Sequence, residues 1–143
     1  MYCSILNNNE EQILEIEELR KKVFGFEEDE NHYFTDGIRR KSIITVGCFY
    51  KNKLIGGCYV TNRLGKLHIE ALFVDNKFQS NKLHIGSGIV NYVNKHKATF
   101  EKLFVTNFKF SSVEPYGEDL VPFYEKLGYH RKNKETLLLR KNI

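Results

Sequence analysis

The 143-residue chain contains no tryptophan, two prolines, one methionine and three cysteines. Cys3, Cys48 and Cys58 are isolated in apolar runs, and neither a CxxC pair nor a His/Cys group with zinc spacing occurs. We therefore expect no metal and interpret the cysteines as small buried side chains, with a nucleophilic cysteine as the less favoured alternative. No apolar run approaches the roughly 18 residues of a membrane helix, and the first residues lack a signal-peptide pattern. We expect a cytoplasmic protein with no membrane partner.

A strong excess of charge of either sign is also lacking, since 22 basic and 18 acidic residues give a net charge of +4. The acidic residues concentrate in residues 10–30 and the basic ones in the second half. No dense basic stripe is present, so we expect no nucleic-acid partner. A small anionic ligand held by the second half suits the distribution better. The length predicts one domain, residues 1–143.

The hydrophobic pattern predicts alternating strands and helices. Apolar residues near a 3.6 period predict a first helix, and β-branched and aromatic runs around Lys51-Asn52-Lys53 predict a hairpin. The expected strands are residues 2–6, 42–50, 54–61, 67–74, 102–110, 129–131 and 136–141, and the expected helices are residues 10–24, about 84–97 and 118–127. Residues 24–40 are expected to form a short helix or ordered loop ending at Gly37, and residues 111–119 a loop. This order predicts a single α/β (α+β) domain whose mostly antiparallel sheet has helices on both faces.

The strand at residues 67–74 contains one carboxylate in an otherwise apolar run, Glu70. Strand alternation places His68, Glu70, Leu72 and Val74 on one face. Burial of an unpaired carboxylate is costly, so Glu70 needs a partner, a cavity or a raised pKa. A raised pKa suits a general base, whereas a pairing with Lys, Arg or His68 across the sheet would be structural. Both interpretations stay open on this evidence.

A polar loop and a helix that begins near His84 follow this strand. The first N–H groups of a helix have no partner within the helix, and the helix dipole favours negative charge there. Strand, loop and helix N-terminus in this order therefore predict an anion site, and a phosphorylated ligand is the first hypothesis.

Two patterns, taken with this element order, resemble the GCN5-related N-acetyltransferase (GNAT) family. The first is LHIEALFVDNKFQSNKLHIGSGIVNYV at residues 67–93, and the second is PFYEKLGY at residues 122–129; TNFKFSS at residues 106–112 looks like a segment of a bacterial subgroup. The resemblance covers about residues 42–131. It implies a mixed, mostly antiparallel twisted sheet of six to seven strands with strands 4 and 5 splayed. It also implies an enzyme that transfers acetyl from acetyl-CoA directly to a primary amine of a small molecule or peptide.

Residue roles follow from this resemblance one position at a time. Glu70 matches the base, and Tyr124 matches the acid that protonates the leaving thiolate; a packing role for Tyr124 beside Leu120 and Leu127 is the structural alternative. The implied acetyl-CoA contacts are Leu72, Phe73, Val74, Gln79, Ser80, Asn81, Lys82, Leu83, His84, Ile85, Gly86, Ser87, Asn107 and Tyr124.

The phosphate loop departs from the family's Q/R-x-x-G-x-G/A pattern. Counted from Val74, Lys82 and His84 stand where glycines belong; counted back from the helix, residues 84–87 align with G-I-G-S and the loop is two residues longer. A catalytically weak or silent GNAT-fold protein that binds a ligand or a protein is therefore the alternative function. We further expect the acidic region at residues 27–36 to receive a cationic substrate, and an exposed C-terminal edge strand to allow a homodimer.

Overall fold

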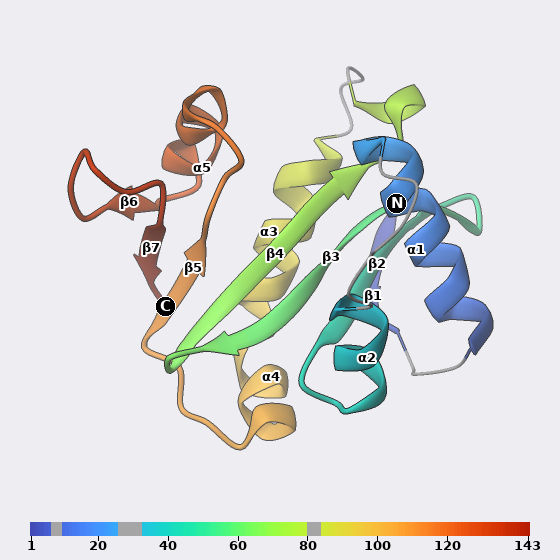
Figure 1. Ribbon diagram of the computed structural model, residues 1–143, viewed down its shortest axis with the longest axis horizontal. Helices are drawn as coiled ribbons and strands as arrows, with labels where there is room; N and C mark the ends of the chain where they lie inside the picture. Colours follow the sequence, from blue (N-terminus) through green and yellow to red (C-terminus); the bar gives the residue numbers. More distant parts are fainter. Residues whose placement is uncertain (7–9, 26–32, 80–83) are drawn as a thin grey trace.

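A computed structural model describes residues 1–6, 10–25, 33–79 and 84–143. Its sheet has the strand order β1-β2-β3-β4-β5-β7-β6, and every neighbouring pair is antiparallel except the parallel pair β4/β5 (Figure 1). The mostly antiparallel, mixed sheet expected from the sequence is confirmed. The strands are β1 (Tyr2–Ile5), β2 (Ile44–Tyr50), β3 (Lys53–Arg63), β4 (Lys66–Val74), β5 (Phe110–Val113), β6 (His130–Arg131) and β7 (Leu139–Asn142).

Helices cover both faces of the sheet (Figure 1). Ile13 and Ile16 of α1 and Ile38 of α2 form one core cluster against the sheet, while α3, α4 and α5 bury a second cluster on the other face. We call these the α1 face and the α3 face. The helices are α1 (Glu10–Phe24), α2 (Tyr33–Arg39), α3 (Ile85–Lys95), α4 (Lys97–Phe104) and α5 (Val121–Lys126), with short 3-10 turns η1 (Asn76–Phe78) and η2 (Glu118–Leu120). No helix in the described part of the chain has the length and apolarity needed to cross a bilayer.

Strands β4 and β5 pair over only three residues and then separate. Leu67, His68 and Ile69 pair with Ser111, Ser112 and Val113, where β5 ends, whereas β4 continues to Val74. The separation is visible in Figure 1, where the end of β4 and the chain that follows β5 diverge. The expected splay of strands 4 and 5 is thereby confirmed. The backbone of β4 beyond Ile69 lacks a β5 partner, so this edge of the strand can bind an extended ligand.

A bulge interrupts β4 directly after Glu70. Tyr59 faces Glu70 and Gly57 faces Phe73, so two residues of β4, Ala71 and Leu72, stand opposite the single residue between Gly57 and Tyr59. Ala71 has a φ of 52°, a left-handed conformation that costs a non-glycine residue about 1–3 kcal/mol. The bulge reverses the alternation of faces that the sequence predicts.

The prediction that Leu72 and Val74 share a face with His68 and Glu70 was therefore wrong. Leu72 and Val74 pack on the α3 face together with Leu67 and Ile69, whereas Phe73 packs on the α1 face. Because an added residue shifts a period of two by one position, every side chain after the bulge changes sides.

The strand expected at residues 102–110 was also wrong. Residues 97–104 form helix α4, since Phe100 is buried and Phe104 lies one turn away on the same side. The strand begins only at Phe110 and includes Ser111 and Ser112, which the sequence placed in a loop. Both serines are fully buried and bond to tertiary partners, Tyr129 and His68. Those long-range partners, rather than local strand propensity, stabilise β5.

Helix α2 continues past its expected end at Gly37. The helix ends at Arg39, and Gly37 is buried within it. A Cβ at Gly37 would lie 2.3 Å from Cδ1 of Ile43, so glycine is required there by close packing rather than by a turn. The remaining elements lie near their predicted ranges, including the short pair β6/β7 at the C-terminal edge. A homodimer contact at that edge stays a prediction.

Candidate active site

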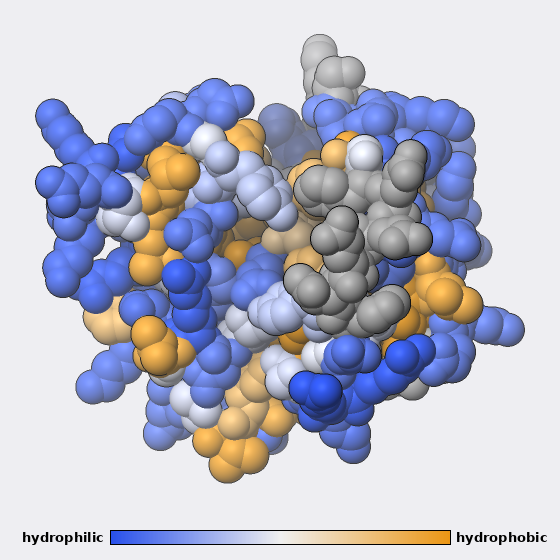
Figure 2. Space-filling view, viewed as in Figure 1, coloured by the Kyte–Doolittle hydropathy of each residue, from blue (hydrophilic) through white to orange (hydrophobic). Residues whose placement is uncertain are grey.

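Two cavities lie on either side of the β4 bulge. The first, of about 460 Å³, lies where β4 and β5 separate and reaches the N-terminus of α3; we call it the cofactor cavity. The second, of about 670 Å³, lies between α2, β3 and β4; we call it the acceptor cavity. Figure 2 shows the surface hollowed between the C-terminal segments and the rest of the molecule, with apolar atoms at the floor. The cofactor cavity is lined by Val23, Phe24, Leu72, Phe73, Val74, Phe78, Gln79, His84, Ile85, Gly86, Ser87, Leu120, Phe123 and Tyr124.

The N-terminus of α3 forms the polar end of the cofactor cavity. Gly88 donates its backbone N–H to the His84 carbonyl at 2.9 Å, and Ser87 Oγ donates to the same carbonyl at 3.0 Å. The N–H groups before Gly88 belong to the first turn, which has no partners within the helix. A Cβ at Gly86 would lie 3.4 Å from the Phe123 ring, so this turn approaches α5 closely. This geometry suits an anion such as a pyrophosphate.

His84 enters α3 in a conformation that glycine usually adopts. Its φ is 51° and its ψ is 47°, which is left-handed backbone. His84 aligns with a glycine of the pattern that the sequence resembles, and its backbone has the conformation that glycine favours. This left-handed backbone costs a non-glycine residue about 1 kcal/mol or more.

The end of β4 forms the apolar wall of the same cavity. Leu72, Phe73 and Val74 line it, and a side-chain bond from Gln79 Nε2 to the Val74 carbonyl (2.8 Å) closes the turn after the strand. Gln79 also donates to Oδ1 of Asn76 at 2.9 Å. The residues have the order that an extended thioester arm needs: an apolar strand edge followed by N–H donors at a helix end. The chemistry of the lining therefore fits coenzyme A.

Tyr124 lies on α5 at the apolar part of this cavity. Its side chain is 8% exposed and packs edge-on against the rings of Phe123 and Tyr129, at 4.9 and 6.0 Å between centroids. Burial raises the pKa of the Tyr124 hydroxyl well above its usual value, so the hydroxyl keeps its proton. Among the described residues, the hydroxyl has no hydrogen-bond partner. Tyr124 is thus both a packed core residue and a protonated tyrosine that lines the cavity.

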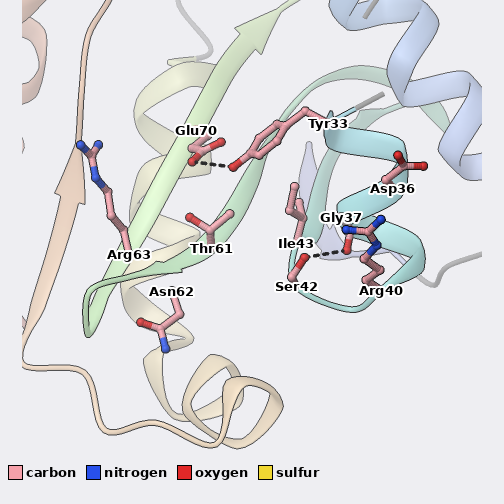
Figure 3. Close-up of a pocket in the computed structure, with 10 residues that line it drawn as sticks. All are labelled: Tyr33, Asp36, Gly37, Arg40, Ser42, Ile43, Thr61, Asn62, Arg63 and Glu70. Atoms are coloured by element: carbon pink, nitrogen blue, oxygen red, sulfur yellow. Dashed lines mark hydrogen bonds between the residues drawn. The ribbon is translucent and has the colours of Figure 1, made fainter. Parts of the chain in front are cut away.

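The acceptor cavity contains Glu70 at one wall (Figure 3). Its lining is polar and carries charges of both signs, from Asp36, Arg40, Arg63 and Glu70. The remaining lining residues are Tyr33, Gly37, Ser42, Ile43, Thr61 and Asn62. A polar cavity of this size with a partly buried carboxylate suits a hydrophilic, amine-bearing ligand.

The Glu70 carboxylate has all three of the features that the sequence offered as alternatives: a partner, a cavity and a raised pKa. It accepts a hydrogen bond from the Tyr33 hydroxyl at 3.3 Å, and it faces a cavity (Figure 3). Burial raises its pKa above the ordinary glutamate value, although the Tyr33 bond and the Arg63 charge oppose this shift. His68 Nε2 lies 4.0 Å from Oε1 of Glu70. The cross-strand ion pair expected as the structural alternative is therefore not the main contact of this carboxylate.

His68 is a buried neutral side chain behind Glu70. Arg63 Nη1 lies 3.4 Å from Nε2, and because a guanidinium only donates, Nε2 is the acceptor. The ring proton is then on Nδ1, which donates to Ser112 Oγ at 2.7 Å. Burial, helped by the Arg63 charge, lowers the pKa of His68 to about 4. His68 therefore fixes β4 to β5 just before they separate and carries no charge near neutral pH.

A buried ion pair on α1 fixes the start of α2. Arg20 donates to both carboxylate oxygens of Glu17, at 3.2 and 2.9 Å, and the Tyr59 hydroxyl also donates to Glu17. The Phe34 ring stacks on Tyr59 at 4.2 Å and lies 4.7 Å below the Arg20 guanidinium. Phe34 follows Tyr33 directly, so this packing positions the Tyr33 hydroxyl against Glu70.

Removal of the Tyr33 hydroxyl is expected to raise the pKa of Glu70. The bond stabilises the charged carboxylate, and a hydrogen bond worth about 1 kcal/mol corresponds to roughly 0.5–1 pH unit. In Tyr33→Phe, the acidic limb of the pH profile of kcat/KM should therefore move to higher pH by about that amount. The ring contact with Phe34, 4.9 Å between centroids, remains in the variant. An acidic limb that stays in place would show that Tyr33 does not act on the base.

The structure brings together most of the residues that the sequence assigned to the site. Leu72–Val74, Gln79, His84–Ser87 and Tyr124 line one cavity, and Glu70 lines the other. Ser80, Asn81, Lys82 and Leu83 lie outside the described residues, as do residues 27–32 of the acidic region. Asn107 lies elsewhere, in the loop between α4 and β5, where it lines a small surface hollow with Glu101 and Thr106. The contact of Asn107 with acetyl-CoA, which the resemblance implied, stays a prediction.

Sequence reasoning missed the aromatic side chains of the cofactor cavity. Phe24, Phe78 and Phe123 line it; Phe78 and Phe123 belong to the quoted motifs, but the sequence assigned no site role to any of the three. Their periodicity matches ordinary core residues, so no sequence signal distinguishes them. Tyr33 and Asp36 fall within the acidic region for which a substrate role was expected, and both line the acceptor cavity. Among the described residues, no group of three or more His, Cys, Asp or Glu side chains could hold a metal ion.

Comparison with known proteins finds similar structures but no protein that is similar in sequence. No family model matches the sequence, and no curated protein matches it. An aminoglycoside 6'-acetyltransferase type Ii is similar in structure, with a TM-score of 0.72 and 18% identity over 99% of this chain and 97% of that chain. PaiA N-acetyltransferase from Thermoplasma acidophilum, in complex with coenzyme A, is similar with a TM-score of 0.64 and 16% identity over 100% of both chains. Tetrahymena GCN5 is similar with a TM-score of 0.69 and 15% identity, over 100% of this chain and 96% of that chain.

The sheet order, the splayed strands 4 and 5, the bulge and these similarities define one class of fold. The chain has the GCN5-related N-acetyltransferase fold over its whole length.

Proposed function

We propose that the protein is an acyltransferase that moves the acetyl group of acetyl-CoA to a primary amine. The observation that carries this proposal is the pair of cavities that lie on either side of the β4 bulge. One cavity offers an apolar strand edge that leads to a helix N-terminus, and the other offers a carboxylate with a raised pKa. A similar structure is described as a complex with coenzyme A, which supports the identity of the cosubstrate.

The residues proposed to hold acetyl-CoA line the cofactor cavity. The first turn of α3, at residues 84–87, would bind the pyrophosphate, and the unpaired edge of Leu72–Val74 would bind the pantetheine arm. The bound cosubstrate would supply an activated acyl group at the strand bulge. Gln79 would hold the turn that joins these two parts.

The chain's own residues would manage the two proton transfers. Glu70, with its raised pKa, would accept a proton from the substrate ammonium, directly or through a water molecule. The amine nitrogen would then form the new C–N bond as the C–S bond breaks, and the nitrogen would lose its second proton to solvent. Tyr124, which keeps its proton, would donate it to the departing sulfur. Tyr124 and Glu70 line cavities on opposite sides of the bulge. A thioester held at the bulge would therefore have the acid on one side and the base on the other.

The acceptor is proposed to be a hydrophilic small-molecule or peptide amine. Its cavity is polar and includes the carboxylates of Asp36 and Glu70. Two of the similar structures are aminoglycoside 6'-acetyltransferases, which supports a small polar amine as the acceptor class.

Release of the coenzyme A thiol tests the proposal. The protein, acetyl-CoA and a panel of polyamines, aminoglycosides and short peptides should give thiol release that depends on the amine, with acetylated product by mass spectrometry. Release that no amine in the panel increases, with no acetylated product, would contradict the transferase assignment.

A second candidate is a GNAT-fold protein that binds a ligand or partner without catalysis. The observation that favours it is His84, a bulky residue in left-handed backbone at the point where phosphate must approach. Binding of coenzyme A without thiol release on any amine would support this candidate over the enzyme.

A further inference from the structure

Two aromatic side chains that are distant in the sequence, Phe24 and Tyr116, contact each other near the end of α1. Phe24 ends α1, and Tyr116 lies in the loop between β5 and η2. Their rings meet edge to face, 5.5 Å between centroids at an interplanar angle of 73°. Phe24 also contacts Phe73 of β4 edge-on, at 6.4 Å and 68°. Tyr116, Phe24 and Phe73 therefore form a continuous aromatic group, which we call the aromatic bridge.

The aromatic bridge closes the cofactor cavity on the α1 face. Phe24 and Phe73 line that cavity, and both belong to the core on the α1 face. The phosphate-binding turn of α3 and the side chains of Leu72 and Val74 lie on the opposite face. Figure 1 shows the same arrangement, with the C-terminal end of α1 on one side of the end of β4 and α3 on the other. The cavity therefore passes between the splayed strands from one face to the other.

This direction fixes which end of the cosubstrate meets the bridge. If the pyrophosphate lies at α3, the far end of the thioester arm emerges on the α1 face, where Glu70 also lies. Tyr116 is 69% exposed and lines neither cavity, so it contacts Phe24 from the solvent side. The bridge thus stands at the acyl end of the arm.

We propose that the aromatic bridge sets the length of the acyl group, with Phe24 as the wall and Tyr116 as its support. The inference rests on the proposed acyltransferase function and specifies its donor: acetyl, with longer acyl chains excluded. A longer chain would have to displace the Phe24 ring from its contacts with Tyr116 and Phe73. A misfit of one methylene in an apolar pocket typically changes selectivity by about tenfold or more.

The test compares kcat/KM for acetyl-, butanoyl- and hexanoyl-CoA with one amine. In Phe24→Ala, the ratio of hexanoyl- to acetyl-CoA activity should rise by about tenfold or more. Tyr116→Ala should move the ratio in the same direction by a smaller factor, because the wall loses its support. Tyr116→Phe keeps the ring and should leave the ratio at the wild-type value.

Phe104→Ala is the matched control for the loss of an aromatic ring. Phe104 contacts Phe108 edge-on at 6.0 Å and lines neither cavity, so this variant should keep the wild-type ratio whatever its stability. If Phe24→Ala does not fold, Phe24→Leu gives a smaller truncation with the same expected direction.

An unchanged ratio in both Phe24→Ala and Tyr116→Ala, in folded proteins that bind coenzyme A, would overturn the inference and leave the acyltransferase function standing. A wild-type protein that binds no coenzyme A would instead remove the proposed function, and the inference with it. Titration of the wild type with coenzyme A is therefore done first, so that the two failures are distinguished.

Discussion

Tyr124→Phe is expected to lower kcat by about 100-fold and to leave the affinity for acetyl-CoA nearly unchanged. The ring remains, so its contacts with Phe123 and Tyr129 are kept, and only the proton donor is lost. An interaction that acts mainly in the transition state changes kcat rather than binding. Steady-state kinetics and a calorimetric titration of the variant separate the two effects.

Tyr129→Phe provides the matched control. The Tyr129 hydroxyl bonds to Ser111 and Asn94 at 2.7 and 2.9 Å, and it lines neither cavity. Its loss should reduce the free energy of unfolding by about 1 kcal/mol per hydrogen bond and leave kcat near the wild-type value. Equal kcat values for Tyr124→Phe and the wild type would assign Tyr124 to packing alone.

Glu70→Gln is expected to lower kcat/KM by about 100-fold and to remove the acidic limb of the pH profile. The base works when deprotonated, and burial raises its pKa above the ordinary glutamate value near 4.3. Wild-type activity should therefore fall as the pH drops through this raised pKa. The glutamine variant has no group to protonate at this position, so its residual activity should lack that fall.

Asp36→Asn tests whether any carboxylate in the acceptor cavity would give the same result. Asp36 lines the cavity with Glu70, so its loss is expected to raise KM for a cationic amine but to keep the acidic limb. If Asp36→Asn loses the acidic limb and Glu70→Gln keeps it, the assignment of the base is wrong.

Local patterns predicted the elements that local interactions stabilise. Helix α1 was expected at residues 10–24 and spans Glu10–Phe24, because its buried residues recur near 3.6 and no competing period is present. The hairpin turn also follows from local chemistry, since Lys51 and Asn52 both adopt positive φ, which a two-residue turn requires. A cavity was one of the alternatives predicted for Glu70 from its position in an apolar strand, and Glu70 lines one.

The parts that sequence reasoning misplaced depend on tertiary contacts. Strand β5 is stabilised by bonds from Ser111 and Ser112 to side chains distant in the sequence. The bulge at Ala71 leaves no mark on the pattern of apolar residues, because both faces of β4 are buried. Asn107 lies in the loop before β5 for a related reason, since the run at residues 102–110 is apolar enough for a strand but begins inside a helix.

Calorimetric titration of the wild-type protein with acetyl-CoA shows whether the cavity between β4, α3 and α5 binds this cosubstrate. The predicted result is one saturable site per chain, with affinity lost in Gly86→Glu, which places a carboxylate at the phosphate-binding turn. No heat of binding at millimolar acetyl-CoA would contradict the proposed acetyl-CoA site, and so would binding that Gly86→Glu leaves unchanged.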